Sequence, residues 1–152
     1  MKEAYVNIWN YTWVQHNAFT LITTNGAVNS YGNLVMGRGI AKQAANKFPG
    51  LSRQLATLVR VKGNRVHVLE ERKGYRLITF PVKHSWDERA DLDLISASAE
   101  QLLYLTGIHR NCLFILPRPG CGNGGLDWKE VKPLLTCLPD NVFVVTNEGR
   151  RI

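Results

Sequence analysis

The sequence lacks any apolar run that approaches the ~20 residues of a membrane-spanning helix. Its polar first ten residues, MKEAYVNIWN, contain no apolar core of a signal peptide. The three cysteines (Cys112, Cys121 and Cys137) are an odd number without metal-ligand spacing, and the four histidines are scattered. These absences exclude a membrane span and a disulfide scaffold. They predict a reduced, cytoplasmic protein without a metal site or a cofactor.

Linkers, internal repeats and low-complexity segments are also absent, so residues 1–152 are expected to form a single domain. A chain of this length buries about two-thirds of its unfolded surface. The hydrophobic content of 45% and the charged content of 20% are ordinary for a globular protein.

Negative charge is scarce, and the formal net charge is +7 with a sequence pI of about 9.6. Such a balance favours polyanionic partners, either phosphate-rich small molecules or nucleic acid. Because no basic run exceeds two or three residues, a solvated basic surface is the alternative to a nucleic-acid contact.

Apolar periodicity predicts strands that alternate with helices. Strands are expected at 5–8, 19–23, 65–70, 75–80, 112–116 and 141–146, with 65–70 and 75–80 forming a hairpin. Helices are expected at 40–48, 51–59, 91–105 and 127–135. The pattern indicates an α/β fold with helices on both faces of a parallel or mixed sheet.

The segment from Asn25 to Phe48 joins an apolar strand, an Asn/Gly loop and an amphipathic helix. Gly37 and Gly39 permit close approach of a ligand to the backbone just before the helix. Since a helix N-terminus offers free N–H groups and a partial positive charge, it favours a phosphate or diphosphate. The alternative is a strand-to-helix turn without a ligand.

A second glycine-rich loop, 117–125, also follows an apolar strand and precedes a helix. In an open α/β sheet such loops lie together at the carboxyl ends of the strands, where they could hold a diphosphate from both sides. Neither loop has the Walker pattern, and no GxGxxG with a ribose-binding acid is present. These absences disfavour a nucleotide triphosphatase and a Rossmann dehydrogenase.

Three blocks in this order resemble the macro domain family: NGAVNSYGNLVMGRGIA (25–41), FPVKHSW (80–86) and PRPGCGNGGLDW (117–128). The last two blocks, with EVKPLL (130–135), are similar to the subgroup of DNA ADP-ribosyl glycohydrolases (DarG-like) and terminal ADP-ribose glycohydrolases. The resemblance implies a three-layer α/β/α sandwich with a mixed central sheet. It also implies that ADP-ribose binds across the strand ends.

The resemblance also assigns roles to individual residues. Asn25 would hydrogen-bond the distal ribose, and Asn29 would support it or simply form a turn. The two diphosphate walls would be Gly37, Arg38, Gly39 and Ile40 on one side, and Gly120, Cys121, Gly122, Asn123 and Gly124 on the other. Cys121 has no partnered histidine in the sequence and is interpreted as a small loop residue, not a nucleophile.

Lys83 matches the catalytic lysine of the FPxK motif in the resembling subgroup. A lysine beside the anomeric carbon could attack it as a neutral amine or stabilise the charge that develops as the ADP-ribosyl bond breaks. The alternative is a surface lysine after a strand. His84 is expected to point the opposite way on the extended segment and to be structural.

Two positions depart from the family pattern. Gly124 stands where some lysine-dependent relatives carry an aspartate, and Asp127 is explained by helix capping. Trp9-Asn10 stands where macro domains usually carry Gly-Asp, so Asn10 could replace the carboxylate that meets the adenine amine.

The leading hypothesis is an ADP-ribosyl hydrolase that removes ADP-ribose from modified DNA or protein with Lys83. The alternatives are a non-catalytic ADP-ribose reader, a phosphatase for ADP-ribose 1″-phosphate, and a basic nucleic-acid-binding module with structural glycine loops. No membrane partner is expected.

Overall fold

The computed structural model describes residues 1–146. The elements, in chain order, are β1 (Lys2–Ala4), α1 (Thr12–Gln15), β2 (Ala18–Thr24), α2 (Gly39–Lys47), α3 (Leu51–Lys62), β3 (Arg76–Pro81), α4 (Leu92–Ile108), β4 (Leu113–Pro117), α5 (Trp128–Leu135) and β5 (Val142–Val145). Among the described residues, no helix is both long and apolar enough to cross a membrane.

The five strands form one sheet in the order β1-β5-β4-β2-β3, and all four pairings within residues 1–146 are parallel. β2 lies between β3 and β4: Phe19 lies opposite Arg76 of β3 on one side and Phe114 of β4 on the other. The expected mixed sheet is therefore wrong in this respect. The physical reason is that neighbouring strands are never joined by a tight turn here, and long crossovers return the chain in the same direction.

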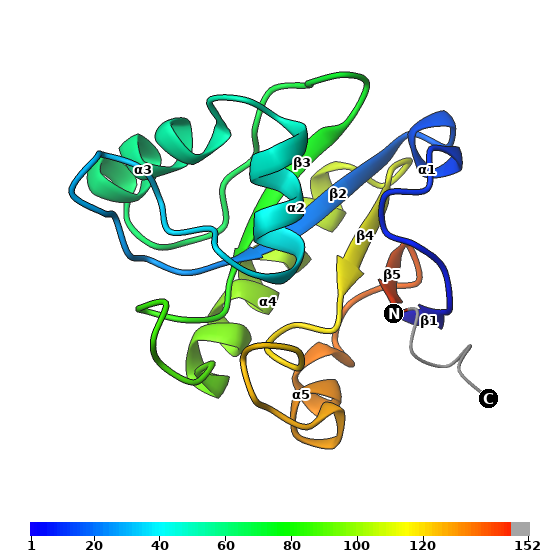
Figure 1. Cartoon of the computed structure of the whole chain (residues 1–152). Coiled ribbons are helices and arrows are strands. Elements are labelled where there is room, and N and C mark those ends of the chain that lie inside the picture. The colour runs from blue at the N-terminus through cyan, green and yellow to red at the C-terminus, as the bar shows by residue number, and fades with distance from the viewer. Residues whose placement is uncertain (147–152) are drawn as a thin grey trace.

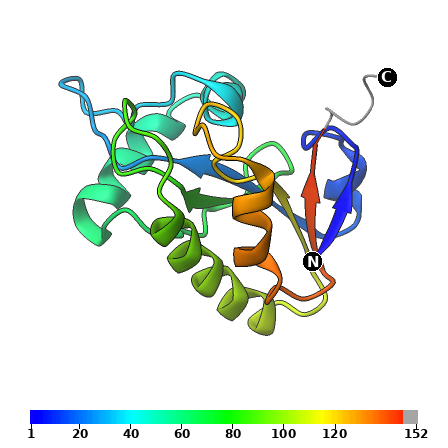
Figure 2. The ribbon, with the colours of Figure 1, turned by 90° about the horizontal axis from the view of Figure 1, so that it is seen from below.

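Helices cover both faces of the sheet (Figures 1 and 2), which confirms the three-layer α/β/α sandwich. Ile22 and Leu77 pack with α2 and α3 on one face. Leu21 and Ile78, each one residue away, pack with α4 and α5 on the other face. This alternation follows from the two-residue period of side chains along a strand.

The predicted helices are confirmed, and their ends have identifiable causes. Asp91 caps α4, since its side chain accepts hydrogen bonds from the backbone N–H groups of Asp93 and Leu94. Asp127 and Glu130 form a capping box at the start of α5. α3 continues beyond the expected residue 59 and ends at Gly63, whose φ of 95° no ordinary helix residue adopts.

Two strand predictions need correction. The first strand is Lys2–Ala4 and not 5–8, because residues 2–4 are the ones in register with β5. The segment 65–70 is not a strand of the sheet. It approaches β3 through the antiparallel bridge Val68–Ile78 and through the hydrogen bond from Leu69 N–H to the Leu77 carbonyl, so only part of the expected hairpin forms.

Candidate functional site

Two cavities lie side by side beyond the carboxyl ends of the strands. The lysine cavity, named after Lys83, has a volume of about 780 Å³, and the tryptophan cavity, named after Trp9 and Trp128, about 760 Å³. Both cavities are lined by Ile40, Pro117, Arg118 and Gly122. These shared residues mark the junction of one continuous groove between the two glycine loops.

The lysine cavity contains most of the sequence-predicted site residues. Its lining includes Asn25, Gly37, Arg38, Gly39, Ile40, Lys83, Gly120, Gly122, Asn123 and Gly124. Cys121 lines the tryptophan cavity instead, beside the shared residue Gly122. Both glycine loops and Lys83 thus line one cavity. The order of strands and loops predicted that the two loops lie together, and the family resemblance placed Lys83 beside them.

The first glycine loop presents its backbone to the groove. Gly39 has a φ of +57°, a left-handed conformation that favours glycine. A Cβ on Gly37 would have no neighbour within 4 Å, so the space above this residue is open. A Cβ on Gly39 would lie 3.4 Å from the Asn123 amide nitrogen, which shows how closely the two loops face each other.

The second loop is folded back on itself. The Leu126 N–H donates to the Gly120 carbonyl at 2.9 Å, and the Gly125 N–H donates to the Gly122 carbonyl at 3.2 Å. Gly120 has a φ of +76°, and a Cβ there would lie 2.9 Å from Cδ1 of Ile95. The loop is therefore a fixed turn that needs glycine at this position.

Lys83 follows β3 and reaches into the lysine cavity, where its Nζ donates to the Trp86 carbonyl at 3.5 Å and to the Asn123 carbonyl at 3.3 Å. Its own carbonyl accepts a hydrogen bond from the Asn64 side-chain amide at 2.9 Å. Hydrogen bonds at the backbone carbonyl and at Nζ thus hold Lys83 beside the groove.

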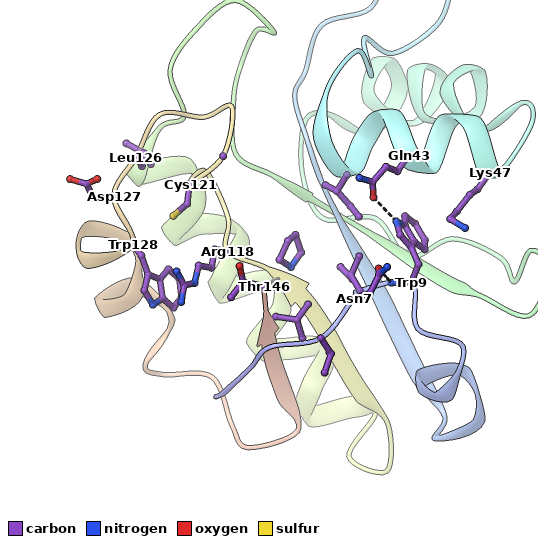
Figure 3. Close-up of a pocket in the computed structure, with 16 residues that line it drawn as sticks. Asn7, Trp9, Gln43, Lys47, Arg118, Cys121, Leu126, Asp127, Trp128 and Thr146 are labelled. Atoms are coloured by element: carbon purple, nitrogen blue, oxygen red, sulfur yellow. Dashed lines mark hydrogen bonds between the residues drawn. The ribbon is translucent and has the colours of Figure 1, made fainter. Parts of the chain in front are cut away.

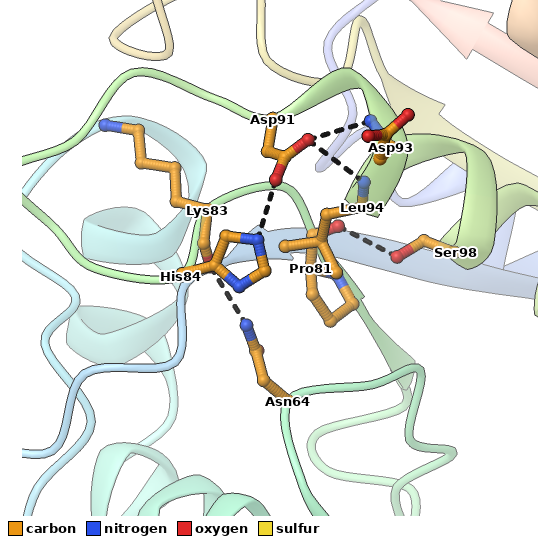
Figure 4. A network of polar contacts seen from close by, with 8 residues as sticks. All are labelled: Asn64, Pro81, Lys83, His84, Asp91, Asp93, Leu94 and Ser98. Carbon is orange, nitrogen blue, oxygen red and sulfur yellow. Dashed lines mark hydrogen bonds and ion pairs between the residues drawn. The ribbon is translucent and has the colours of Figure 1, made fainter.

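His84 points away from the Lys83 side chain, as expected for consecutive residues on an extended segment (Figure 4). Its Nε2 lies 2.8 Å from an Asp91 carboxylate oxygen, while the other Asp91 oxygen caps α4. The hydrogen bond from His84, followed by the N–H of Asp93, lowers the pKa of Asp91 below its ordinary value. His84 therefore fastens the segment after Lys83 to the start of α4.

Asn25 lines the lysine cavity, but its amide is used within the protein. Its Nδ2 donates to the Val35 carbonyl, and its Oδ1 accepts from the Ala27 N–H, both at 2.9 Å. These contacts join the two ends of the loop 25–35, which leads into Gly37 and Gly39.

Asn29 and Asn10 lie outside both cavities. The Asn29 side chain accepts from the N–H groups of Tyr31 and Asn33 and so forms a turn. The Asn10 side chain accepts from Thr12 at the start of α1. It is Asn7, three residues earlier, that lines the tryptophan cavity.

Two indole side chains line opposite sides of the tryptophan cavity (Figure 3). Trp9 donates from Nε1 to the Gln43 side chain at 2.7 Å, and Lys47 Nζ lies 5.2 Å from the centre of its ring. On the other side, Arg118 lies over the Trp128 ring at 5.0 Å. Flat apolar surfaces edged by polar groups suit a planar heteroaromatic ligand.

Several lining residues were not singled out from the sequence. The segment after Lys83 contributes Trp86, Asp87, Glu88 and Arg89 to the lysine cavity, and Arg118 lines both cavities. The sequence signal was their position: Trp86 and Arg118 lie within two of the three motif blocks, and residues 87–89 directly follow the block that contains Lys83. In the described part of the chain, no cluster of His, Cys, Asp or Glu side chains could hold a metal ion.

The sheet order, the flanking helices and the paired glycine loops define the macrodomain fold. The macrodomain of Mycobacterium tuberculosis DarG has a TM-score of 0.73 with this chain, at 24% identity over 95% of each chain. The macrodomain of Thermus aquaticus DarG has a TM-score of 0.68, at 23% identity and the same coverage.

A third structure, Thermosipho africanus DarTG in complex with ADP-ribose, has a TM-score of 0.67 at 20% identity. The match covers 88% of this chain but 39% of that protein. No model of a known protein family matches the sequence, and no curated protein matches it either. These likenesses establish the fold that the sequence motifs predicted.

Proposed function

We propose that the groove binds ADP-ribose and that the protein is a hydrolase that removes ADP-ribose from modified DNA or protein with Lys83. The single observation that carries the catalytic proposal is the position of the Lys83 side chain: its Nζ lies 3.3 Å from the Asn123 carbonyl of the second glycine loop, in the cavity that the first loop also lines. The structure of Thermosipho africanus DarTG with ADP-ribose supports the choice of ligand.

In this proposal the adenosine occupies the tryptophan cavity and the distal ribose occupies the lysine cavity. The diphosphate crosses the junction, which Ile40 on one loop and Gly122 on the other line, next to the open backbone at Gly37. The N-terminus of α2 adds free N–H groups and a partial positive charge on the same side. Asn7 takes the position at the adenine end that the sequence had suggested for Asn10.

Lys83 has two possible roles. As a neutral amine, Nζ would form a bond to the anomeric carbon while the bond to the macromolecule breaks, and water would later release ADP-ribose and free the lysine. As an ammonium, it would stabilise the charge of the leaving group while water attacks the anomeric carbon directly. Its present contacts with two carbonyl oxygens suit the ammonium form.

A reader that binds ADP-ribose without turnover is the second candidate. It is favoured by Gly124, since a Cβ at this position would lie 2.4 Å from the Gly120 carbonyl oxygen and no aspartate fits. Against it, Asp87 and Glu88 line the same cavity as Lys83 and supply carboxylates from another segment.

The test compares wild type with Lys83→Ala and Lys83→Arg on ADP-ribosylated DNA and ADP-ribosylated protein, with release of ADP-ribose as the measurement. Arginine keeps the positive charge but does not attack carbon, so activity of Lys83→Arg supports the ammonium role. Lys62→Ala is the matched control, because Lys62 is exposed at the end of α3 and lines neither cavity.

Loss of activity in Lys83→Ala with retained ADP-ribose binding would support the hydrolase. Binding by the wild type without turnover of any conjugate would support the reader, and release of inorganic phosphate from ADP-ribose 1″-phosphate would identify the phosphatase. Strongly salt-dependent binding of unmodified nucleic acid, without competition by ADP-ribose, would identify a basic nucleic-acid-binding module.

A further inference from the structure

Arg118 occupies the junction of the two cavities. It directly follows Pro117, the last residue of the central strand β4, and it lines both the lysine cavity and the tryptophan cavity. Its side chain is 23% exposed, so most of it is covered by protein while the residue still lines the groove.

Two side chains from distant parts of the sequence hold the guanidinium in place. Trp128, in the first turn of α5, lies beneath it at 5.0 Å (Figure 3). Glu3 of β1 approaches one terminal nitrogen of Arg118 at 3.7 Å. Both contacts restrict the side chain before any ligand arrives, which reduces the entropy lost on binding.

Glu3 is itself fixed by two donors. Its carboxylate accepts from Lys132 Nζ at 2.8 Å and from Trp128 Nε1 at 2.9 Å. The hydrogen bond from Lys132, opposed in part by burial, holds the pKa of Glu3 below its ordinary value. Glu3 is therefore ionised at neutral pH, and its charge is shared between Lys132 and Arg118.

The side-chain N–H groups of Arg118 are available to a ligand. Among residues 1–146, its guanidinium makes no hydrogen bond, because the Glu3 contact at 3.7 Å is too long to be one. None of its nitrogen atoms is among the buried, unpartnered side-chain atoms of the described residues, so these N–H groups are accessible from outside the protein. A planar fork of donors matches the oxygens of a phosphate group.

We propose that Arg118 binds the diphosphate of the ligand at the junction of the two cavities, in an orientation set by Trp128 and Glu3. This inference rests on the proposed function, and it adds a side-chain cation to the backbone N–H groups of the two glycine loops. Together with those N–H groups, Arg118 would favour a nucleoside diphosphate over the nucleoside alone.

The test measures the affinities of ADP-ribose, ADP and adenosine for the wild type, Arg118→Ala and Arg118→Lys, by calorimetry or by NMR titration for the weak ligand. Arg118→Ala is expected to lower the affinities for ADP-ribose and ADP by roughly 10- to 100-fold, the range for a lost charge-assisted hydrogen bond. Adenosine affinity is expected to be unchanged. Arg118→Lys keeps the positive charge but lacks the planar guanidinium, so its affinities for ADP-ribose and ADP are expected to lie between those of the wild type and Arg118→Ala.

Arg60→Ala is the matched control, since Arg60 is an exposed arginine of α3 that lines neither cavity. Its affinities should equal those of the wild type. Thermal unfolding of each variant confirms that it is folded, and Arg118→Lys provides the comparison if the alanine variant does not fold.

The outcomes separate the two proposals. A wild type that binds neither ADP-ribose nor ADP would overturn the proposed function. A wild type that binds both, with ADP affinity unchanged in Arg118→Ala and Arg118→Lys, would overturn the role of Arg118 alone. Equal losses for ADP and adenosine would overturn that role as well, because they would indicate a general disturbance of the tryptophan cavity.

Discussion

A Cβ atom on Gly124 would lie 2.4 Å from the carbonyl oxygen of Gly120. Real Cβ atoms essentially never approach a neighbour so closely, and the neighbour is backbone that cannot rotate away. The second loop therefore depends on glycine at 124 for a steric reason, whether or not a ligand is bound. The loop aspartate of some lysine-dependent macro domains has no room here.

The Gly124 contact predicts that Gly124→Ala reshapes the loop and weakens ADP-ribose binding by roughly 10-fold or more. Overlap with backbone costs on the order of 1–3 kcal/mol, which appears as distortion of the site or as lost stability. Calorimetry with ADP-ribose and thermal unfolding measure the two effects. Gly107→Ala, in α4 and with no atom within 4 Å of the new Cβ, is the control that should bind normally.

Asn64→Ala is expected to lower the rate of ADP-ribosyl release several-fold with little change in KM. The variant removes the 2.9 Å hydrogen bond from the Asn64 amide to the Lys83 carbonyl, so the lysine backbone loses one of its supports. Single-substrate kinetics on an ADP-ribosylated oligonucleotide or protein gives both constants. An unchanged kcat would show that Lys83 is positioned without Asn64.

The contact between His84 and Asp91 predicts that Asp91 stabilises the protein at neutral pH and loses this effect in acid. Because the folded-state pKa of Asp91 lies below its ordinary value of 3.8, the carboxylate contributes stability above that pH and loses it as the pH falls through the folded value. Asp91→Ala is expected to lower Tm by roughly 2–4 °C at neutral pH through the lost cap. The difference from wild type should narrow below pH 3.8.

Thermal unfolding between pH 7 and pH 2 measures this dependence. Asp93→Ala is the control: its backbone N–H remains to be capped, so its Tm should follow the wild type more closely. A constant gap between wild type and Asp91→Ala down to the lowest pH would contradict the assignment.

Trp9→Ala is expected to lower the free energy of unfolding by about 2 kcal/mol, because the indole packs against Phe48 and Tyr75 at ring distances of 5.9 and 5.6 Å. Urea denaturation gives the value. Tyr104→Ala, at a side chain that is 72% exposed, should change stability by less than about 0.5 kcal/mol. If Trp9 also forms the wall for adenine, the folded variant should lose affinity for adenosine.

The helices and glycine loops could be predicted from the sequence because their signals are local. The apolar residues of α2 recur at helical spacing, and the caps Asp91 and Asp127 stand directly before their helices. The strand expected at 112–116 is confirmed as β4, because its continuous apolar residues are a local signal of a strand buried on both faces.

The direction of the strands, and which polar side chains face the groove, could not be predicted from local signals. The two-residue period is identical in parallel and antiparallel strands, so the pattern at 65–70 resembled a hairpin strand. Which asparagine faces the groove depends on local hydrogen bonds: Asn10 caps a turn, while Asn7 reaches the cavity. Arg118 was missed because its partner Glu3 lies at the other end of the chain.

The hydrogen bonds that join the two ends of the loop 25–35 make its tip a suitable place for a fluorescent label. Two hydrogen bonds join the ends of this loop: Asn25 Nδ2 donates to the Val35 carbonyl, and the Val35 N–H donates to the Ala27 carbonyl. Tyr31, near the tip of the loop, is 79% exposed. A fluorescent dye attached at residue 31 would therefore lie outside the groove, on a loop whose two ends are joined by hydrogen bonds beside the lysine cavity. Its emission could follow ligand binding in real time without any label inside the groove.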